Sequence, residues 1–406
     1  MNLPYFIAKR ISDPGDNSFS AVIHKIAIAS VALGLAIMMI AFFVLGGFQE
    51  NIKDKIFSFS GHIQIKKFSL NNSYEEEPIV IDAERMATLL EDPYVEHIQE
   101  YAHKPGLISK DGEVHGLIFK GVTSNFNKAL FDKYMVEGEF ISFNDSISTD
   151  SDVMISSKMA KNLGLKIGDK VINYFIMDPP KTRRVTVKGI YSTGLDTFDD
   201  QMMIGNINVI RSLNGWKSDE VGGYEVYLKN IDDIAAADDS IIGKLSVEHY
   251  TERVDDKFVQ IFDWLNLLSK NVSIFIWLIL LVASFNMVSV LFILIMERTQ
   301  MIGTFKALGA SNSLIRRIFS YNGFRLVLKG LLVGNAIAIG FAFLQDFFHI
   351  IPLDAANYYM EYVPIDWDWS VTIGLNLLTL ILVSFVLIIP TAIIARIKPV
   401  TAIRFD

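Results

Sequence analysis

Three long runs of apolar residues without a formal charge dominate the pattern of hydrophobic and polar positions. They cover residues 26–49, 271–296 and 369–395. Each exceeds the ~20 residues that a helix needs to cross ~30 Å of hydrocarbon. A fourth run, 330–345, is shorter, and it becomes long enough if Lys329 extends its ammonium group to one interface while aromatic residues after the run lie at the other.

The pattern therefore predicts four transmembrane helices, at 26–48, 271–296, 326–348 and 370–395. A buried core helix is the alternative, and it has most weight for the short run. The first run could also be a cleaved signal peptide. Its apolar stretch is longer than the 7–15 residues of a signal peptide's hydrophobic region and no A-x-A site follows, so we expect an uncleaved helix.

Basic residues near the helix ends predict the orientation, because cytoplasmic loops carry an excess of Lys and Arg. Segment 297–329 has six basic residues and one acid, whereas the connection 346–369 has five acids and no base. Segments 1–25, 297–325 and 396–406 should therefore be cytoplasmic. The large segment 49–270 and the short loop 349–369 should face outward.

Segment 49–270 is long enough for one large domain or two small ones. Alternating runs predict strands and 3.6-residue patterns predict helices between them, as listed here: strands at 62–67, 153–155, 171–175 and 184–190, helices at 83–90 and 156–163. The mixture indicates an α+β domain. Residues 174–184 predict a hairpin with its tip at 177–181, where two prolines cannot donate to a ladder. The exposed Ile-Met beside that tip is either a docking loop or an ordinary turn.

Both ends of this domain read as amphipathic continuations of membrane helices. Apolar residues recur at helical spacing over 48–59 and again over 254–268. Two such stalks could pack together and connect the outer domain mechanically to the membrane. Their apolar stripes are most simply core, and the alternative is a cavity for a lipid-like substrate.

Composition strengthens the membrane prediction. Hydrophobic residues make up 51% of the 406 residues with glycine left out, and charged residues only 20%. In soluble domains the apolar share is usually about 45–50% even when glycine is counted as apolar. The absence of cysteine excludes disulfides and thiolate chemistry, and a net charge of −8 gives no basic field for nucleic acid.

Catalytic and metal motifs are absent from the sequence. There is no G-x-x-x-x-G-K-[ST] phosphate loop, no G-x-S-x-G and no paired-histidine motif, so we expect no catalytic residue and no metal site. The four membrane runs contain no ionisable residue, which disfavours a proton-coupled carrier. Asn286 and Asn335 should hydrogen-bond between helices, and the small residues Gly330, Gly334 and Gly340 should allow close helix packing.

Segment 297–329 carries the most specific pattern. Met301, Phe305 and Leu308 form an apolar face on a short helix that Gly309 would end. Ser311 or Ser313 could cap a second, basic amphipathic helix, which could lie at the membrane surface. The first helix is too short to be stable alone, so a groove in a partner protein would explain it.

The residues around this segment resemble the membrane subunit of the FtsX/MacB superfamily of ABC transporters. The matching positions are 283–286, 297–298, 302–303, 306–311 and 318–319. Further positions are similar to the Lol-type lipoprotein-releasing permeases within that superfamily: 155–169, 189–200, 353–364 and 398–404. One departure is the hairpin at 175–183, which is shorter than the family's loop that recruits the soluble carrier.

The resemblance implies an integral membrane α-helical protein with four transmembrane helices and a large extracytoplasmic α+β domain. It would lie in the bacterial inner membrane, with both termini cytoplasmic and the large domain periplasmic. The chain would bind no cofactor, because a separate cytoplasmic ATPase, with two copies expected, would hold ATP and Mg. It would extract acylated lipoproteins from the outer leaflet and pass them to a periplasmic carrier, beside a second permease copy or a paralogue.

The resemblance also implies three groups of site residues. Coupling to the ATPase would use Glu297, Arg298, Gln300, Met301, Gly303, Thr304, Lys306, Ala307, Leu308 and Gly309. The acyl chains would enter a cavity of apolar stalk residues, namely Phe42, Phe43, Phe48, Ile52, Phe262, Leu265 and Leu268. The carrier would dock on the hairpin residues Ile176, Met177, Asp178, Pro179, Pro180 and Lys181.

Two other functions stay open. The first is a MacB-like exporter of peptides, antibiotics or lipids that works with an outer-membrane channel. The second is an FtsX-like regulator of a cell-wall hydrolase that transports nothing, which the length of the outer domain disfavours.

Overall fold

The computed structural model describes residues 3–11, 19–68, 76–110, 112–143, 151–354, 358 and 360–393. The predicted cytoplasmic segment 396–406, with the motif at 398–404, lies outside them. The chain forms two compact units. Met1–Glu50, Trp264–Leu353 and Tyr362–Asp406 make the first, which we call the helical unit, and Asn51–Asp263 with Asp354–Glu361 make the second, the β-rich unit.

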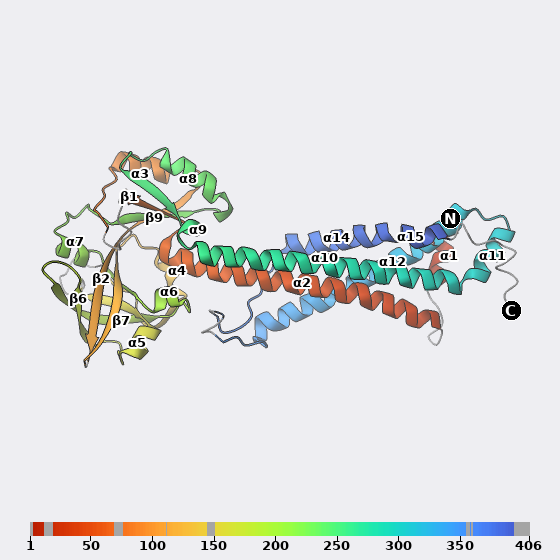
Figure 1. Ribbon diagram of the computed structural model, residues 1–406, viewed down its shortest axis with the longest axis horizontal. Coiled ribbons are helices and arrows are strands. Elements are labelled where there is room, and N and C mark those ends of the chain that lie inside the picture. The colour runs from red at the N-terminus through yellow and green to blue at the C-terminus, as the bar shows by residue number, and fades with distance from the viewer. Residues whose placement is uncertain are drawn as a thin grey trace. The chain divides into compact units, whose positions relative to one another are not determined.

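The helical unit is built from long helices that run alongside one another (Figure 1). Its helices are α1 (Leu3–Ile11), most of α2 (Phe19–Ser60), most of α10 (Val259–Glu297), α11 (Thr299–Ala307), α12 (Asn312–Phe348), α14 (Trp369–Val386) and α15 (Ile388–Ile393). Within the described part of the chain, four helical stretches are long and apolar enough to cross a membrane: Ala21–Ser60, Val259–Glu297, Asn312–Phe348 and Trp369–Thr391.

The third of these helices differs from the prediction. We expected a separate amphipathic helix, with the membrane surface as one location, followed by a membrane helix from residue 326. Instead α12 runs without a break from Asn312 to Phe348. The predicted second helix and the membrane helix are thus one element, because nothing in 320–329 interrupts the backbone. Ile315 and Phe319, on its first turns, are buried.

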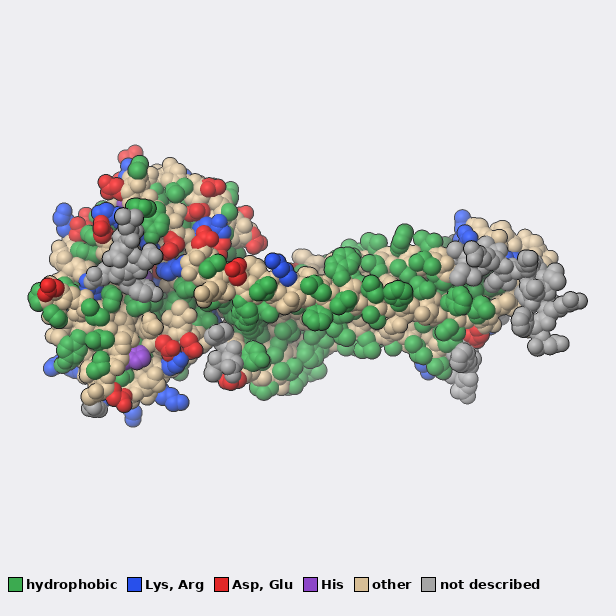
Figure 2. Space-filling view, viewed as in Figure 1, with side chains coloured by type: hydrophobic (Ala, Val, Ile, Leu, Met, Phe, Trp, Pro, Cys, Tyr) green, Lys and Arg blue, Asp and Glu red, His purple; other side chains and the backbone are tan. Residues whose placement is uncertain are grey.

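Apolar side chains from four helices fill the core of the helical unit. Leu35 and Met39 of α2, Leu291 of α10 and Val327 of α12 are buried together with Val383 of α14. Figure 2 shows that hydrophobic side chains also cover most of the visible outer surface of these helices, whereas charged side chains gather on the β-rich unit. A helix that is apolar on all sides is typical of a membrane span.

The β-rich unit contains ten strands in one connected sheet. They are β1 (Ile63–Lys67), β2 (Val95–Lys110), β3 (Glu113–Val122), β4 (Met135–Gly138), β5 (Asp152–Ser156), β6 (Lys170–Phe175), β7 (Lys181–Tyr191), β8 (Met202–Asn206), β9 (Gly223–Leu228) and β10 (His249–Arg253). Short helices connect them: α3 (Ala83–Leu90), α4 (Lys128–Asp132), α5 (Ser157–Asn162), α6 (Asp196–Asp199), α7 (Asn208–Asn214), the 3₁₀ turn η1 (Ile231–Asp233), α8 (Ile234–Ile242) and α9 (Val254–Lys257).

Part of this sheet closes into a barrel, because β6 pairs with both β2 and β7. The ring runs β2, β3, β8, β5, β7, β6 and back to β2. The first half of β2 instead pairs with β9, which continues through β1 to β10 as an open sheet. The 16-residue strand β2 therefore belongs to both parts, and its length holds them in one body.

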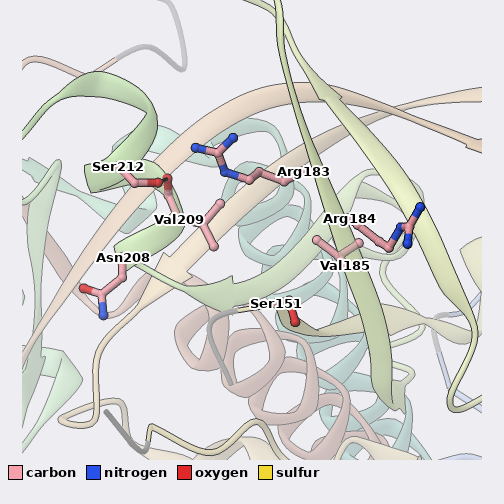
Figure 3. Close-up of a pocket in the computed structure, with 7 residues that line it drawn as sticks. All are labelled: Ser151, Arg183, Arg184, Val185, Asn208, Val209 and Ser212. Carbon is pink, nitrogen blue, oxygen red and sulfur yellow. Dashed lines mark hydrogen bonds between the residues drawn. The ribbon is translucent and has the colours of Figure 1, made fainter. Parts of the chain in front are cut away.

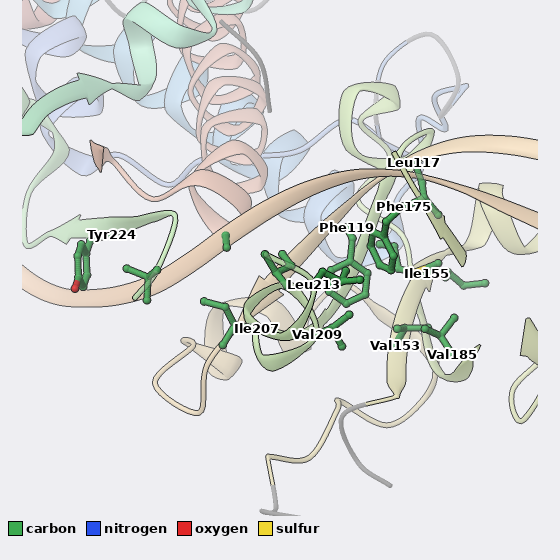
Figure 4. Close-up of a cluster of buried hydrophobic side chains, with 14 of the residues drawn as sticks. Leu117, Phe119, Val153, Ile155, Phe175, Val185, Ile207, Val209, Leu213 and Tyr224 are labelled. Carbon is green, nitrogen blue, oxygen red and sulfur yellow. The ribbon is translucent and has the colours of Figure 1, made fainter. Parts of the chain in front are cut away.

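The barrel interior is filled by alternating residues of its strands. Phe119 of β3 and Phe175 of β6 meet with ring centroids 5.7 Å apart, next to Val153, Ile155 and Val185 (Figure 4). The burial of β6 alternates residue by residue, as expected of a strand with one face in a core. The α+β content agrees with the sequence prediction.

Candidate functional site

The short helix α11 is held against its neighbours by a small apolar cluster of its own. Ile302 of α11 is fully buried with Ile295 of α10 and with Ile315 and Phe319 of α12. Met301 and Phe305, both half-buried, and Ala310 pack against the same cluster. These contacts explain how a nine-residue helix keeps its shape, since helices this short are marginal without tertiary packing.

The turn after α11 has well-defined caps. The amide of Ala310 donates to the carbonyl of Phe305 at 2.9 Å, and that of Gly309 donates to Lys306 at 3.0 Å. This is the Schellman pattern, and Gly309 has the left-handed φ of +90° that the pattern requires. The hydroxyl of Ser311 then accepts from the amide of Leu314 at 3.2 Å and caps α12. α11 and α12 are thus joined by one tight turn.

The remaining coupling candidates divide into an exposed and an inner group. Glu297, Gln300, Thr304, Ala307, Leu308 and Gly309 are exposed, Arg298 and Lys306 are half-buried, and Gly303 is buried. Burial lowers the pKa of Lys306. Of the three residues predicted to form one apolar face, Met301 and Phe305 pack inward, whereas α11 ends at Ala307 and Leu308 is 78% exposed. Ile302, which had no predicted role in the apolar face, is fully buried in the cluster.

The candidate cavity residues on the stalks are in two different environments. Phe43, Ile52 and Leu265 are buried, and the ring of Phe43 lies 5.7 Å from that of Trp367. Four candidates keep a partly open surface that a ligand could contact: Phe42, Phe48, Phe262 and Leu268.

Polar and aromatic contacts join α2 and α10 within the helical unit. The amide of Gln49 donates to the carbonyl of Leu265 at 2.9 Å and to the hydroxyl of Ser269 at 2.7 Å. The rings of Phe48 and Trp264 meet edge to face at 5.4 Å. The two stalks therefore pack together at this level, as the amphipathic patterns predicted.

The hairpin between β6 and β7 has its tip at 176–180, one residue before the predicted position, because Lys181 already pairs with Phe175 in the ladder. Ile176 is 55% exposed, whereas Met177 packs against the core of the β-rich unit. The ammonium of Lys181 donates to the carbonyl of Leu213 at 2.7 Å. The exposed part of the tip is thus limited to Ile176 and the segment 178–180.

The small residues of α12 also fall into two groups. A Cβ on Gly330 would lie 2.7 Å from the Cβ of Val31, and one on Gly334 would lie 2.7 Å from the carbonyl oxygen of Ala32, so both glycines allow close contact with α2. A Cβ on Gly340 would meet no described atom within 4 Å.

The two membrane asparagines also differ. Asn335 and Asn376 exchange two side-chain hydrogen bonds, of 2.7 and 2.9 Å, between α12 and α14. Asn286 of α10 is exposed, so the predicted bond between helices is described for Asn335 alone.

A pocket of about 260 Å³ opens in the β-rich unit, and no candidate site residue is among those that line it. Arg183, Arg184 and Val185 of β7 line it together with Ser151 and three residues of α7 (Figure 3). Figure 3 shows the two guanidinium groups directed to different sides, as expected of neighbours on one strand. The pocket therefore gathers no convergent set of charges.

Comparison with known proteins places these features in a wider group. Residues 26–244 match the model of the MacB-like periplasmic core domain, and residues 273–399 match that of the FtsX-like permease C-terminal domain. The lipoprotein-releasing system transmembrane protein LolC of Neisseria meningitidis is 23% identical and is covered to 96%, as is this chain. LolE of Haemophilus influenzae is 22% identical, with 98% of each chain covered.

Among solved structures, the periplasmic region of MacB from Actinobacillus actinomycetemcomitans covers 53% of this chain and 97% of its own length. Its sequence identity is 13% and its TM-score is 0.36.

Proposed function

This chain belongs to the family of membrane permeases that combine a MacB-like periplasmic core domain with an FtsX-like C-terminal domain, and we propose that it releases acylated lipoproteins from the inner membrane. In this proposal a separate ABC ATPase drives the extraction, and a periplasmic carrier accepts the lipoprotein. Similarity to LolC and LolE over nearly the whole chain supports this choice.

The observation that carries the proposal is the construction of α11. Its inner face is fixed by Ile302 and Phe305, and its outer face presents Gln300, Thr304 and Leu308. An exposed leucine at the end of a firmly held helix suits a groove in a partner protein, since a helix that lies in such a groove binds through its apolar side chains. The partner in this proposal is the cytoplasmic ATPase, present in two copies.

The cost of extracting a lipid anchor explains why ATP would be needed. Each buried CH₂ contributes roughly 0.8 kcal/mol to membrane binding, so a triacylated anchor is held by tens of kcal/mol. Phe42, Phe48, Phe262 and Leu268 are half-buried apolar residues that could contact acyl chains during release. Arrangement with a second permease copy or a paralogue would enclose them further.

Purification of the permease with its ATPase in detergent, followed by mass spectrometry of bound proteins, tests the function. We expect acylated proteins that leave the complex when ATP and a periplasmic carrier are added. Co-purification with an adaptor and an outer-membrane channel, without acylated proteins, would favour a MacB-like exporter. Binding of a cell-wall hydrolase in their place would favour an FtsX-like regulator. Either result would overturn the proposal.

A further inference from the structure

A buried ion pair lies inside the β-rich unit, where its charges have no access to water. The ammonium of Lys120 on β3 lies 2.6 Å from a carboxylate oxygen of Glu225 on β9, and the two side chains are 1% and 0% exposed. Burying such a pair is costly and often adds nothing to stability. Its position is therefore better explained by what else the two groups bind.

Lys120 also caps the end of the first stalk helix. Its ammonium donates to the carbonyl of Phe59 in the last turn of α2. The last carbonyls of a helix have no partner within the helix, and they carry partial negative charge. A lysine of the sheet thus supplies both the missing hydrogen bond and the favourable charge.

Gln64 connects that helix end with the start of the second stalk. Its amide nitrogen donates to the carbonyl of Ser60 at 3.1 Å, and its amide oxygen accepts from the ammonium of Lys257 at 2.8 Å. Lys257 ends α9, which directly precedes α10 (Figure 1). Glu225 lies within reach as well, 3.4 Å from the amide nitrogen of Gln64.

The other side of the same helix end is held by aromatic rings. The ring of Phe59 stacks on Phe198 at 4.6 Å and lies 5.1 Å from Phe131 and 5.5 Å from Tyr191. Phe59 is 2% exposed. α2 therefore ends between an aromatic cage and a cluster of buried charges, and both are built from strands and short helices of the β-rich unit.

We propose that Lys120, Glu225 and Gln64 are positioning residues that clamp the last turn of α2 and the end of α9 to the sheet, so that these two stalk ends and the sheet of the β-rich unit move together. An ion pair that served stability alone would not need to bind the carbonyl of Phe59. The first test below, which measures lipoprotein release, rests on the proposed function. The second test, which measures a distance within the β-rich unit, does not.

The first experiment compares two variants of the full complex in proteoliposomes. K120M/E225Q removes the donor to Phe59 and leaves no uncompensated charge. K133M is the matched control. Lys133 also contacts α2, through an ion pair with Asp54 at 2.8 Å, but its side chain is 45% exposed. We expect K120M/E225Q to keep ATP hydrolysis within about twofold of the wild type and to release at least tenfold less lipoprotein per ATP.

K133M should release the wild-type amount per ATP. Wild-type release per ATP by K120M/E225Q would overturn the inference, and so would a parallel loss of hydrolysis and release in a folded protein. If K120M/E225Q does not fold, Q64M takes its place, because Met fills the volume of Gln64 while the link between Ser60 and Lys257 is lost.

The second experiment measures how rigidly the end of α2 is held against the sheet. The chain has no cysteine, so spin labels can be attached at K53C on α2 and V114C on β3 without other changes. We expect one narrow distance distribution in the wild type with and without nucleotide, and a distribution at least twice as wide in K120M/E225Q. Equal widths would overturn the clamp. A wild-type complex that releases no lipoprotein would refute only the proposed function, because the distance measurement needs no cargo.

Discussion

Two neighbouring residues at the end of α11 show how one backbone conformation decides what a side chain can do. The left-handed Gly309 ends the helix, and Leu308, one residue before it, becomes 78% exposed. Helical spacing places Leu308 on one apolar face with Met301 and Phe305. Because the helix ends before Leu308, the side chain of Leu308 stays exposed at the turn while Met301 and Phe305 pack inward.

Replacing Leu308 should weaken ATPase binding. We expect L308S to cost about 2 kcal/mol at the interface, or roughly a 30-fold higher Kd, because the burial of one leucine side chain is lost. Binding of the purified ATPase to the permease in detergent measures this. L90S is the matched control, because Leu90 of α3 is also exposed, at 51%, but lies in the β-rich unit. An unchanged Kd for L308S would contradict the assignment.

His62 should make the β-rich unit sensitive to acid. Burial lowers its pKa from 6.5 to about 4, and its Nδ1 accepts a hydrogen bond from the amide of Leu228 at 2.7 Å. Between pH 6.5 and 4 the unfolded chain binds a proton that the folded chain does not. Stability from this group is therefore complete above pH 6.5 and falls as the pH drops toward 4, by at most about 3 kcal/mol.

The variant H62N keeps an acceptor for Leu228 but does not titrate. We expect its thermal unfolding midpoint in detergent to fall less than that of the wild type between pH 6.5 and 4. Parallel curves for the two proteins would show that His62 does not cause the acid sensitivity.

At the scale of elements, α12 shows that a pattern of small residues identifies an interface without giving its extent. Gly330 and Gly334 lie against α2, while Gly340, six residues after Gly334, meets no described neighbour. The three glycines look equivalent in the sequence. Which of the three glycines lie in the contact depends on where α12 crosses α2, and this position depends on the tilt of the two helices.

The pair G334V and G340V tests this difference with the same change in side chain and helix propensity. G334V should lose roughly 1–3 kcal/mol, because the new side chain would overlap the backbone of Ala32. G340V should stay within about 0.5 kcal/mol of the wild type. Unfolding of the full chain in detergent gives both values, and equal losses would contradict the described contact.

At the scale of the whole molecule, the sequence was sufficient to predict which segments form helices and strands. It was not sufficient to predict that part of the sheet closes into a barrel. Apolar runs predicted the four long helices, and alternation predicted β1, β5, β6 and β7 to within a few residues. Nothing in the sequence indicated that β6 would close a barrel against β2. That pairing joins residues far apart in the chain, and no local pattern encodes such a partner.

The functional residues show the same difference between local patterns, which the sequence reveals, and long-range contacts, which it does not. The segment around α11 was found from its sequence, since caps and periodicity are local. The burial of Lys120 was not predicted, because its partner Glu225 is 105 residues away and a lysine in an amphipathic strand ordinarily faces water.

A reversible cross-link between the stalks should separate ATP hydrolysis from release. Gln49 and Ser269 already share a hydrogen bond of 2.7 Å, so Q49C and S269C can be joined by a short methanethiosulfonate reagent. If acyl chains enter between the stalks, the cross-linked complex should release at least tenfold less lipoprotein. Reduction should restore release, and full release by the cross-linked complex would exclude entry at this level.

The unbroken course of α12 has a geometric consequence. A helix of 37 residues is a rod about 55 Å long, and it starts at the turn that holds α11. If one end of such a rod stays fixed, a tilt of only about 5° displaces the other by roughly 5 Å. An adjustment of the cytoplasmic turn that would be hard to detect could therefore become, at the far side of the bilayer, a movement as large as the width of an acyl chain.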